Sequence, residues 1–383
     1  MDAPAFAQIK LHKYFGGGEV FARTLCEAAA SLGRRSILVV HPEAPHWREF
    51  RLPQTELLFA TSSEEAVAQL RPGVPLITHA PLPDALAQRV ATERVLAGIV
   101  HMPIDLYYGS SRDAYRRYHA VVPVSAYVAE TLRRIGIEPY PEALYGFADL
   151  DRLKSAGPAA LEARSQYEWD KRKLRDRLLG ATEPLWGRLR RRRVFVRRPG
   201  LTLGVVSRIA PIKQFPLLFT HLAPHIARRE GVWLEIFGAG GYASMRDLRA
   251  ALAPLGDKVR YWGFQPQVAA AYAQIDVLLT GLPEREALGL NIIEAQACGV
   301  PVLAPQAPPF DETVVEGRTG FFYRDPREDD GADFARLLDR LRALPALPDP
   351  RQFPEAAGRF SFAAFSSRVG RLVDHLAALS GAN

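Results

Sequence analysis

Short apolar runs alternate with stretches of helical periodicity along the N-terminal part of the chain. The apolar runs predict buried strands at residues 5–15, 36–42, 74–81, 97–103 and 120–125. The helical stretches cover residues 21–33, 62–70, 83–95 and 126–137. Strands that alternate with helices of this length are typical of βαβ units, so the pattern predicts a parallel sheet covered by helices.

A second alternating series begins at residue 201. Its predicted strands cover residues 201–210, 232–240, 258–264, 276–281 and 301–306. Its predicted helices cover residues 216–229, 242–256, 266–275 and 290–298. We therefore predict an α/β fold of two facing Rossmann-like domains, with ligands bound at the carboxyl ends of the strands.

The two series divide the chain into predicted domains. Residues 1–155 form an N-terminal Rossmann-like domain on the acceptor side, and residues 200–358 form a C-terminal domain that binds the nucleotide. Residues 156–199 form a basic linker or insert with a charged helix at residues 161–180. Residues 359–383 contain a final helix that is expected to pack back on the N-terminal domain.

Composition narrows the class of protein. A chain of 383 residues is longer than one ordinary hydrophobic core supports, which indicates two domains. Its contents of 48% apolar and 24% charged residues are normal for a soluble protein. No apolar run approaches the roughly 20 residues that span a bilayer, and the N-terminus lacks the basic and apolar regions of a secretory signal. Cys26 and Cys298 lie in helical patterns and fit structural thiols, so we expect a cytoplasmic protein.

The formal charge of +7 is concentrated in residues 188–198, from Arg188 to Arg198. We expect residues 194–206 to form a hairpin that turns at residues 198–200 and displays these cations. These cations have four alternative partners: an anionic membrane surface, a phosphate-bearing acceptor, nucleic acid or plain solvent. Without a helix-turn-helix or an aromatic RNA-binding motif, we expect no nucleic acid as a partner. Among the anionic partners, the inner face of the membrane is the favoured one, and binding there would be peripheral.

Several candidate residues follow predicted strands. Gly17 and Gly18 precede the first helix, where backbone amides can approach an anion, or they form a tight turn. Arg208 and Lys213 can hold a diphosphate, or they are solvated surface cations. Gly238 lies in another glycine-rich segment that follows a predicted strand. This segment either approaches a phosphate closely or is simply a turn.

Two glutamates lie around the start of the apolar helix 290–298. Glu286 precedes the amides of Leu288, Gly289 and Leu290, which form a positive helix start suited to a phosphate or sugar. Glu294 is the helix's single charge, and a carboxylate there can accept hydrogen bonds from a ribose diol or pair with a buried arginine. We see no Asp-x-Asp motif or histidine cluster that is suited to a metal, so we expect no metal and no cofactor.

Six motifs in order resemble retaining nucleotide-sugar glycosyltransferases of the two-Rossmann GT-B fold, specifically glycosyltransferase family 4. They are GGGEVFARTLCEAAASLG, AGIVHMPID, VVPVSAYVAETLRRIGI with ALYGFADLDRL, VVSRIAPIKQF, EREALGLNIIEAQACGVPV and RFSFAAFSSRV. The fifth carries the family's Glu-x7-Glu spacing and the fourth its Arg-x4-Lys spacing. The chain departs from the family at Gln214, where glycine is usual, and at Ala287-Leu288, where Gly-Phe is usual.

The resemblance implies an activity and roles for matching residues. The protein would move a hexose from a UDP- or GDP-linked sugar to a saccharide or lipid-linked acceptor, as in bacterial surface glycan or lipopolysaccharide synthesis. Glu294 would bind the ribose, Glu286 the transferred sugar, and His101 would lie beside the reacting sugar. Arg208 and Lys213 would neutralise the diphosphate, which Gly17 and Gly18 would also approach. The alternative for His101 is a structural histidine whose hydrogen bonds are satisfied at the end of a strand. The alternative for the protein is an epimerase or hydrolase of the same fold.

Overall fold

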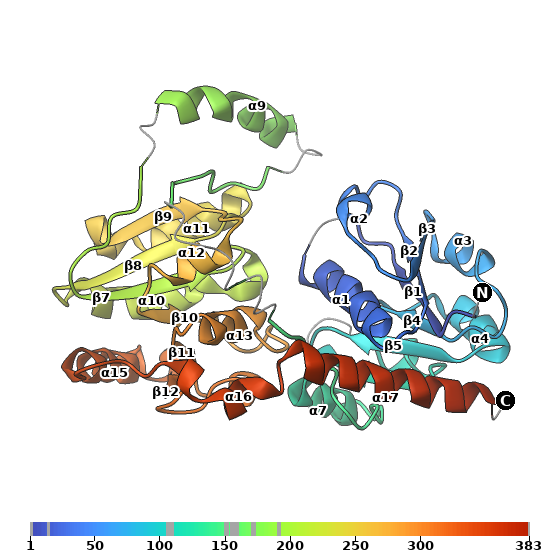
Figure 1. Ribbon diagram of the computed structural model, residues 1–383. Coiled ribbons are helices and arrows are strands. Elements are labelled where there is room, and N and C mark those ends of the chain that lie inside the picture. Colours follow the sequence, from blue (N-terminus) through green and yellow to red (C-terminus); the bar gives the residue numbers. More distant parts are fainter. Residues whose placement is uncertain are drawn as a thin grey trace. The chain divides into compact units, whose positions relative to one another are not determined.

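The computed structural model describes residues 3–13, 16–104, 111–148, 153, 161–169, 174–189 and 193–381. The chain forms two compact units (Figure 1). Unit 1 comprises Met1–Phe147 and Arg359–Asn383, and unit 2 comprises Ala148–Gly358. The finer domain boundaries at residues 155 and 199 stay a prediction.

Unit 1 is built on a six-stranded parallel sheet. Its strands are β1 (Phe6–Lys10), β2 (Ser36–Val40), β3 (Thr55–Phe59), β4 (Leu76–Thr78), β5 (Leu96–Val100) and β6 (Ala120–Pro123). They lie in the order β3-β2-β1-β4-β5-β6, and every strand pair is parallel. This is the Rossmann order, in which ligands bind where the order reverses, between β1 and β4.

Helices connect the strands of unit 1. They are α1 (Gly17–Ser31), α2 (His46–Glu49), α3 (Ser63–Ala68), α4 (Asp84–Glu93), α6 (Ser111–Ala114) and α7 (Ala126–Arg134). Side-chain caps begin two of them, because Ser62 accepts a hydrogen bond from the Glu65 amide and Ser125 accepts one from the Val128 amide. The predicted serine start of α3 is therefore confirmed.

The final helix, α17 (Phe362–Gly381), belongs to unit 1 and lies along α1 (Figure 1). Phe365 is buried on α17 and meets the Phe21 ring of α1 edge-on at 5.5 Å. At the other end of the contact, Arg34 donates to Asp374 at 2.6 Å. The prediction that the C-terminal helix packs back on the N-terminal domain is confirmed.

Unit 2 repeats the architecture. Its strands are β7 (Leu201–Val206), β8 (Val232–Phe237), β9 (Val259–Gly263), β10 (Val277–Leu279), β11 (Val302–Pro305) and β12 (Gly320–Tyr323). Their order is β12-β11-β10-β7-β8-β9, again all parallel, so the order reverses between β7 and β10. The predicted α/β fold of two Rossmann-like sheets is confirmed. Strands β3 and β12 are additions that the apolar pattern did not reveal.

The described helices of unit 2 lie before, between and after these strands in the chain. The α-helices are α9 (Leu174–Leu189), α10 (Phe215–Ala227), α11 (Tyr242–Ala251), α12 (Val268–Tyr272), α13 (Leu290–Ala297), α14 (Pro326–Asp329), α15 (Ala332–Ala343) and α16 (Pro354–Gly358). Short 3-10 turns are η1 (Pro211–Lys213), η2 (Ala253–Lys258), η3 (Phe310–Glu312) and η4 (Pro350–Gln352).

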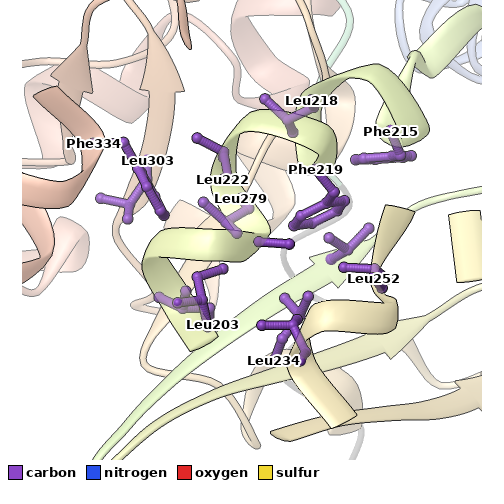
Figure 2. Close-up of a cluster of buried hydrophobic side chains, with 14 of the residues drawn as sticks. Leu203, Phe215, Leu218, Phe219, Leu222, Leu234, Leu252, Leu279, Leu303 and Phe334 are labelled. Atoms are coloured by element: carbon purple, nitrogen blue, oxygen red, sulfur yellow. The ribbon is translucent and has the colours of Figure 1, made fainter. Parts of the chain in front are cut away.

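Helix α10 supplies the centre of the larger core of unit 2 (Figure 2). Phe215, Leu218, Phe219 and Leu222 follow helical spacing, and all four are buried. They pack against side chains from the strands and from neighbouring helices, among them Leu203, Leu234, Leu279, Leu303 and Phe334 (Figure 2). This core fixes the start of α10, and with it the Lys213 turn that precedes the helix.

The predicted helix at residues 161–180 is wrong in its first half. Residues 161–169 are extended: Glu162 forms an antiparallel bridge with Val194, and Tyr167 forms a parallel bridge with Gly240. The charged sequence allows a helix, but buried Leu161 and backbone bonding to the sheet of unit 2 override that local preference. We call residues 161–169 the inserted arm.

The predicted hairpin at residues 194–206 is also wrong. Val194 pairs with the inserted arm, while β7 pairs with β8 and β10. Arg198 is not displayed to solvent as expected, since it bonds to Glu235 at 3.1 Å and to the Lys258 carbonyl at 3.0 Å. Arg197 forms an ion pair with Asp276. Arg190, Arg191 and Arg192 lie outside the described residues.

Candidate functional site

The candidate residues of unit 2 follow the two strands between which the sheet order reverses. Arg208 and Lys213 come after β7, and Glu286 comes after β10. The two connections touch, because a Cβ built on Gly281 would lie 2.3 Å from the Lys213 carbonyl oxygen. The tertiary structure thus brings the Arg-x4-Lys segment against the loop that carries Glu286.

Lys213 forms an ion pair with Glu286, and both side chains are mostly buried. The other carboxylate oxygen of Glu286 accepts from the amides of Ala287 at 3.3 Å and Gly289 at 3.2 Å. Both carboxylate oxygens of Glu286 thus have hydrogen-bond donors from within unit 2. One of the amides predicted to receive a ligand therefore bonds within the chain, and Glu286 links the cation to the start of α13.

Arg208 has a partner that the sequence did not indicate. Its Nε donates to the carboxylate of Glu168 at 2.7 Å, and its Nη2 lies 2.6 Å from the same oxygen. Glu168 is held in place because its amide donates to the Gly240 carbonyl at 2.9 Å, beside the bridge formed by Tyr167. The inserted arm thus carries a carboxylate to the predicted phosphate-binding arginine.

Gly238 directly follows β8 and allows two backbones to approach closely. A Cβ at this position would lie 1.9 Å from the Ser207 carbonyl oxygen, a distance that no side chain tolerates. The fold itself therefore requires glycine here, whatever passes the loop. A contact between Gly238 and a donor phosphate stays a prediction.

Helix α13 begins after Gly289, whose φ of 82° is one that glycine adopts readily. Leu288 is buried beside it, and Leu290 is the first helical residue. One turn further on, the Tyr272 hydroxyl lies 3.0 Å from a carboxylate oxygen of Glu294. Burial, and then the Glu294 charge, raise the pKa of Tyr272, so this hydroxyl stays protonated and can donate to Glu294.

Gln214 lies between η1 and α10 with a left-handed φ of 54°. This is the position at which the resembling family usually has glycine, and the backbone shows why glycine suits it. The Gln214 Oε1 atom is buried without a hydrogen-bond partner. Glutamine in place of glycine at position 214 is therefore held in an unfavourable backbone conformation directly beside Lys213.

In unit 1, Gly17 and Gly18 form the first residues of α1, beyond the carboxyl end of β1. A Cβ on Gly17 would meet no heavy atom within 4 Å, whereas a Cβ on Gly18 would lie 2.8 Å from Lys10 Nζ. Glu19 follows, and it is buried 3.3 Å from Lys10 and 3.3 Å from His12. The glycines therefore lie beside a charged cluster and are not explained by tight backbone packing.

His101 directly follows β5 and is hydrogen-bonded inside unit 1. Its Nε2 lies 2.8 Å from His79 Nδ1, and His79 Nε2 lies 2.8 Å from Gln8 Oε1. Burial, and then the charge of Lys10, lower the pKa of His101 to about 3. His101 is therefore a neutral, oriented imidazole.

Among the described residues, no three or more His, Cys, Asp or Glu side chains are grouped so that they could hold a metal ion. In the described part of the chain, no helix is both long and apolar enough to cross a membrane. Burial raises the pKa values of the thiols of Cys26 and Cys298 to about 11, so both are protonated near neutral pH.

Comparisons with known proteins agree with this architecture. Residues 191–358 match the family model of glycosyl transferases group 1. D-inositol 3-phosphate glycosyltransferase of Segniliparus rotundus is 34% identical over 190 residues, which are 47% of this chain and 40% of that protein. A GDP-mannose-dependent alpha-(1-6)-phosphatidylinositol monomannoside mannosyltransferase of Mycobacterium tuberculosis is 34% identical over 167 residues, 41% of this chain and 43% of that protein. The chain thus spans less than half the length of these curated relatives.

Two solved structures share the fold over nearly the whole chain. HepE of Anabaena in complex with UDP has a TM-score of 0.68 at 15% identity and covers 97% of this chain and 99% of its own. Sucrose-phosphate synthase of Thermosynechococcus elongatus has a TM-score of 0.68 at 18% identity and covers 98% and 99%. Together the comparisons show that residues 191–358 are similar to glycosyl transferases group 1 and that the chain shares the overall fold of these two structures.

Four residues of these clusters were missed by the sequence reasoning: Glu168, Tyr272, His79 and Gln8. Gln8 and His79 left a usable signal, since Gln8 is a polar residue inside an apolar strand and His79, like His101, directly follows a strand. Glu168 and Tyr272 left none, because their roles arise from pairing across the fold.

Proposed function

We propose that the protein transfers a sugar from a nucleoside diphosphate sugar to an acceptor, without a metal and with retention of anomeric configuration. The observation that carries the proposal is the Lys213–Glu286 ion pair where the sheet order of unit 2 reverses, with Arg208 on the same connection after β7. Two cations there can stabilise the negative charge that develops on the leaving diphosphate. The relatives' names point to sugar nucleotides and to inositol-containing acceptors.

The proposed roles follow the matched motifs. Arg208 and Lys213 bind the diphosphate, and Glu294, steadied by Tyr272, accepts hydrogen bonds from the ribose hydroxyls. Glu286 binds hydroxyls of the transferred sugar while it positions Lys213. His101 of unit 1 forms a hydrogen bond with the reacting sugar. Gly17 and Gly18, also of unit 1, approach the phosphates.

The direct test measures transfer from UDP-glucose and GDP-mannose to saccharide, inositol phosphate and phosphatidylinositol acceptors. Retention is read from the anomeric signals of the product by NMR, and metal independence from activity in EDTA. Release of free sugar or an altered donor without any acceptor would indicate the hydrolase or epimerase alternative. Absence of binding and turnover with every donor would overturn the proposal.

We also propose that the basic residues between Arg188 and Arg193 bring the protein to the anionic inner face of a membrane, where a lipid-linked acceptor of surface glycan synthesis would lie. Arg198 is excluded from this role because it is mostly buried against Glu235, and Arg197 is left out because it already pairs with Asp276. Each remaining arginine would contribute about 1 kcal/mol at an anionic surface. Equal sedimentation with anionic vesicles of wild type and a variant with alanine at residues 190–193 would contradict the idea.

A further inference from the structure

Three polar side chains on or directly after neighbouring strands of unit 1 form a chain of hydrogen bonds, here called the relay, whose Gln8 end is buried. Gln8 lies inside β1, His79 directly follows β4, and His101 directly follows β5. These strands are adjacent in the order β1-β4-β5, so the three side chains can meet. The Gln8 Oε1 atom lies 2.8 Å from His79 Nε2, and His79 Nδ1 lies 2.8 Å from His101 Nε2.

The direction of the relay is determined by its buried end. The Gln8 Nε2 atom lies 3.2 Å from the carbonyl oxygen of Ala22, which can only accept, so this end of the amide must be the donor. Gln8 Oε1 therefore accepts from His79 Nε2. A neutral His79 then has its lone pair on Nδ1, and this atom must accept from His101 Nε2.

The surroundings keep both rings neutral. Gln8 is fully buried and His79 is 9% exposed. The facing charged groups are Lys10 and its partner Glu19, and the edge of the Phe21 ring closes on His101 at 5.0 Å between centroids. Burial, together with the Lys10 charge, lowers the pKa values of both imidazoles. A neutral His101 that donates from Nε2 keeps its lone pair on Nδ1.

We infer that Gln8 and His79 are positioning residues that hold His101 as the neutral Nε2–H tautomer, so that His101 Nδ1 accepts a hydrogen bond from a substrate hydroxyl. The substrate part of this inference rests on the proposed function, whereas the tautomer part does not. Neither Gln8 nor His79 needs to touch the substrate for this role.

The tautomer is tested in the full chain by long-range proton–nitrogen NMR after labelling histidine with ¹⁵N. The signals of His79 and His101 are assigned from the single variants His79→Gln and His101→Gln. We expect both residues to be neutral Nε2–H tautomers between pH 6 and pH 8, a range that brackets the usual histidine pKa of about 6.5. An Nδ1–H tautomer or an imidazolium at either residue in that range would overturn the inference, whether or not the protein transfers sugar.

Kinetics then test the consequence. Gln8→Met keeps a similar shape but removes the acceptor, so we expect turnover to fall about tenfold, the scale of lost positioning contacts, with little change in the donor KM. Gln8→Glu, as a neutral carboxylic acid in this buried position, retains an acceptor for His79 and a donor for the Ala22 carbonyl, and should keep most of the turnover. The matched control is Thr131→Val, which removes a buried hydrogen bond elsewhere in unit 1. An equal loss in the control, or no rescue by glutamate, would reduce Gln8 to a structural residue.

Discussion

Glu168 and Arg208, forty positions apart in the chain, are joined by a hydrogen bond of 2.7 Å between the Glu168 carboxylate and Arg208 Nε. The contact exists because the inserted arm bonds to Gly240, three residues after β8. A carboxylate and a diphosphate are both suited to the same guanidinium, so Glu168 and a bound nucleotide would compete for Arg208.

Replacing Glu168 with glutamine should tighten nucleotide binding. Loss of the competing charge frees Arg208, and because exposed ion pairs contribute about 0–1 kcal/mol, the Kd for UDP or GDP should fall by up to about fivefold. Calorimetric titration measures the change. Asp339→Asn, which removes another exposed partner of an arginine in unit 2, is the control and should leave the Kd unchanged. Weaker binding after Glu168→Gln would show that the carboxylate assists the ligand.

Lys213→Ala should reduce turnover far more than it reduces stability. The lysine is partly buried, and its charge is directed at Glu286, where the diphosphate is expected. Removal of one cation that stabilises developing charge typically costs about 100-fold or more in kcat. Arg208→Ala should act in the same direction. If both variants turn over normally while urea unfolding shows a loss of stability, these residues are structural only.

Tyr272→Phe should weaken nucleotide binding through Glu294. The variant keeps the buried ring but removes the hydroxyl that lies 3.0 Å from the Glu294 carboxylate. A lost hydrogen bond to a charged group is worth about 1.5–3 kcal/mol, so part of this loss should appear as a Kd raised about tenfold. Glu294→Ala should weaken binding at least as much. If Tyr272→Phe destabilises the fold and leaves the Kd intact, the tyrosine serves packing alone.

Glu235→Gln should strongly destabilise unit 2. Glu235 is 1% exposed and accepts from Arg260 at 2.9 Å, Trp262 at 2.6 Å and Arg198 at 3.1 Å. Removing one partner of a buried ionic cluster costs about 3–5 kcal/mol because the other charges lose their compensation. Urea unfolding measures the loss. Asp339→Asn again serves as the exposed control, and a similar small effect of both variants would contradict the prediction.

Acid should destabilise unit 1 partly through His101. The folded pKa is about 3, below the usual value of about 6.5, so between these values the unfolded state binds more protons. The contribution of neutral His101 to the free energy of unfolding is therefore fully present above about pH 6.5 and is lost as the pH falls toward 3. His101→Gln retains a side-chain donor for His79 but cannot titrate. Between pH 7 and pH 5 its free energy of unfolding should fall by about 1–2 kcal/mol less than that of wild type, and parallel pH curves would refute this origin.

Much of the fold follows from local patterns. Apolar runs of strand length, the serine caps of α3 and α7, and helical spacing on α10 act over a few residues, so the alternation of strands and helices is visible along the chain. The motif spacings likewise identify Arg208, Lys213, Glu286 and Glu294 as candidates. Strand β3 escaped because its burial is only partial, and its apolar signal is correspondingly weak.

What the amino-acid sequence determined by itself was the α/β class, the two Rossmann-like sheets and the chemistry available in each loop. Only the tertiary structure decided that residues 161–169 are an extended arm, that Arg208 meets Glu168, and that Gln8 orients His79 and His101. The physical reason is distance along the chain. Periodicity and capping are interactions between near neighbours, whereas ion pairs and buried relays form between residues that only the folded sheets bring within hydrogen-bonding reach.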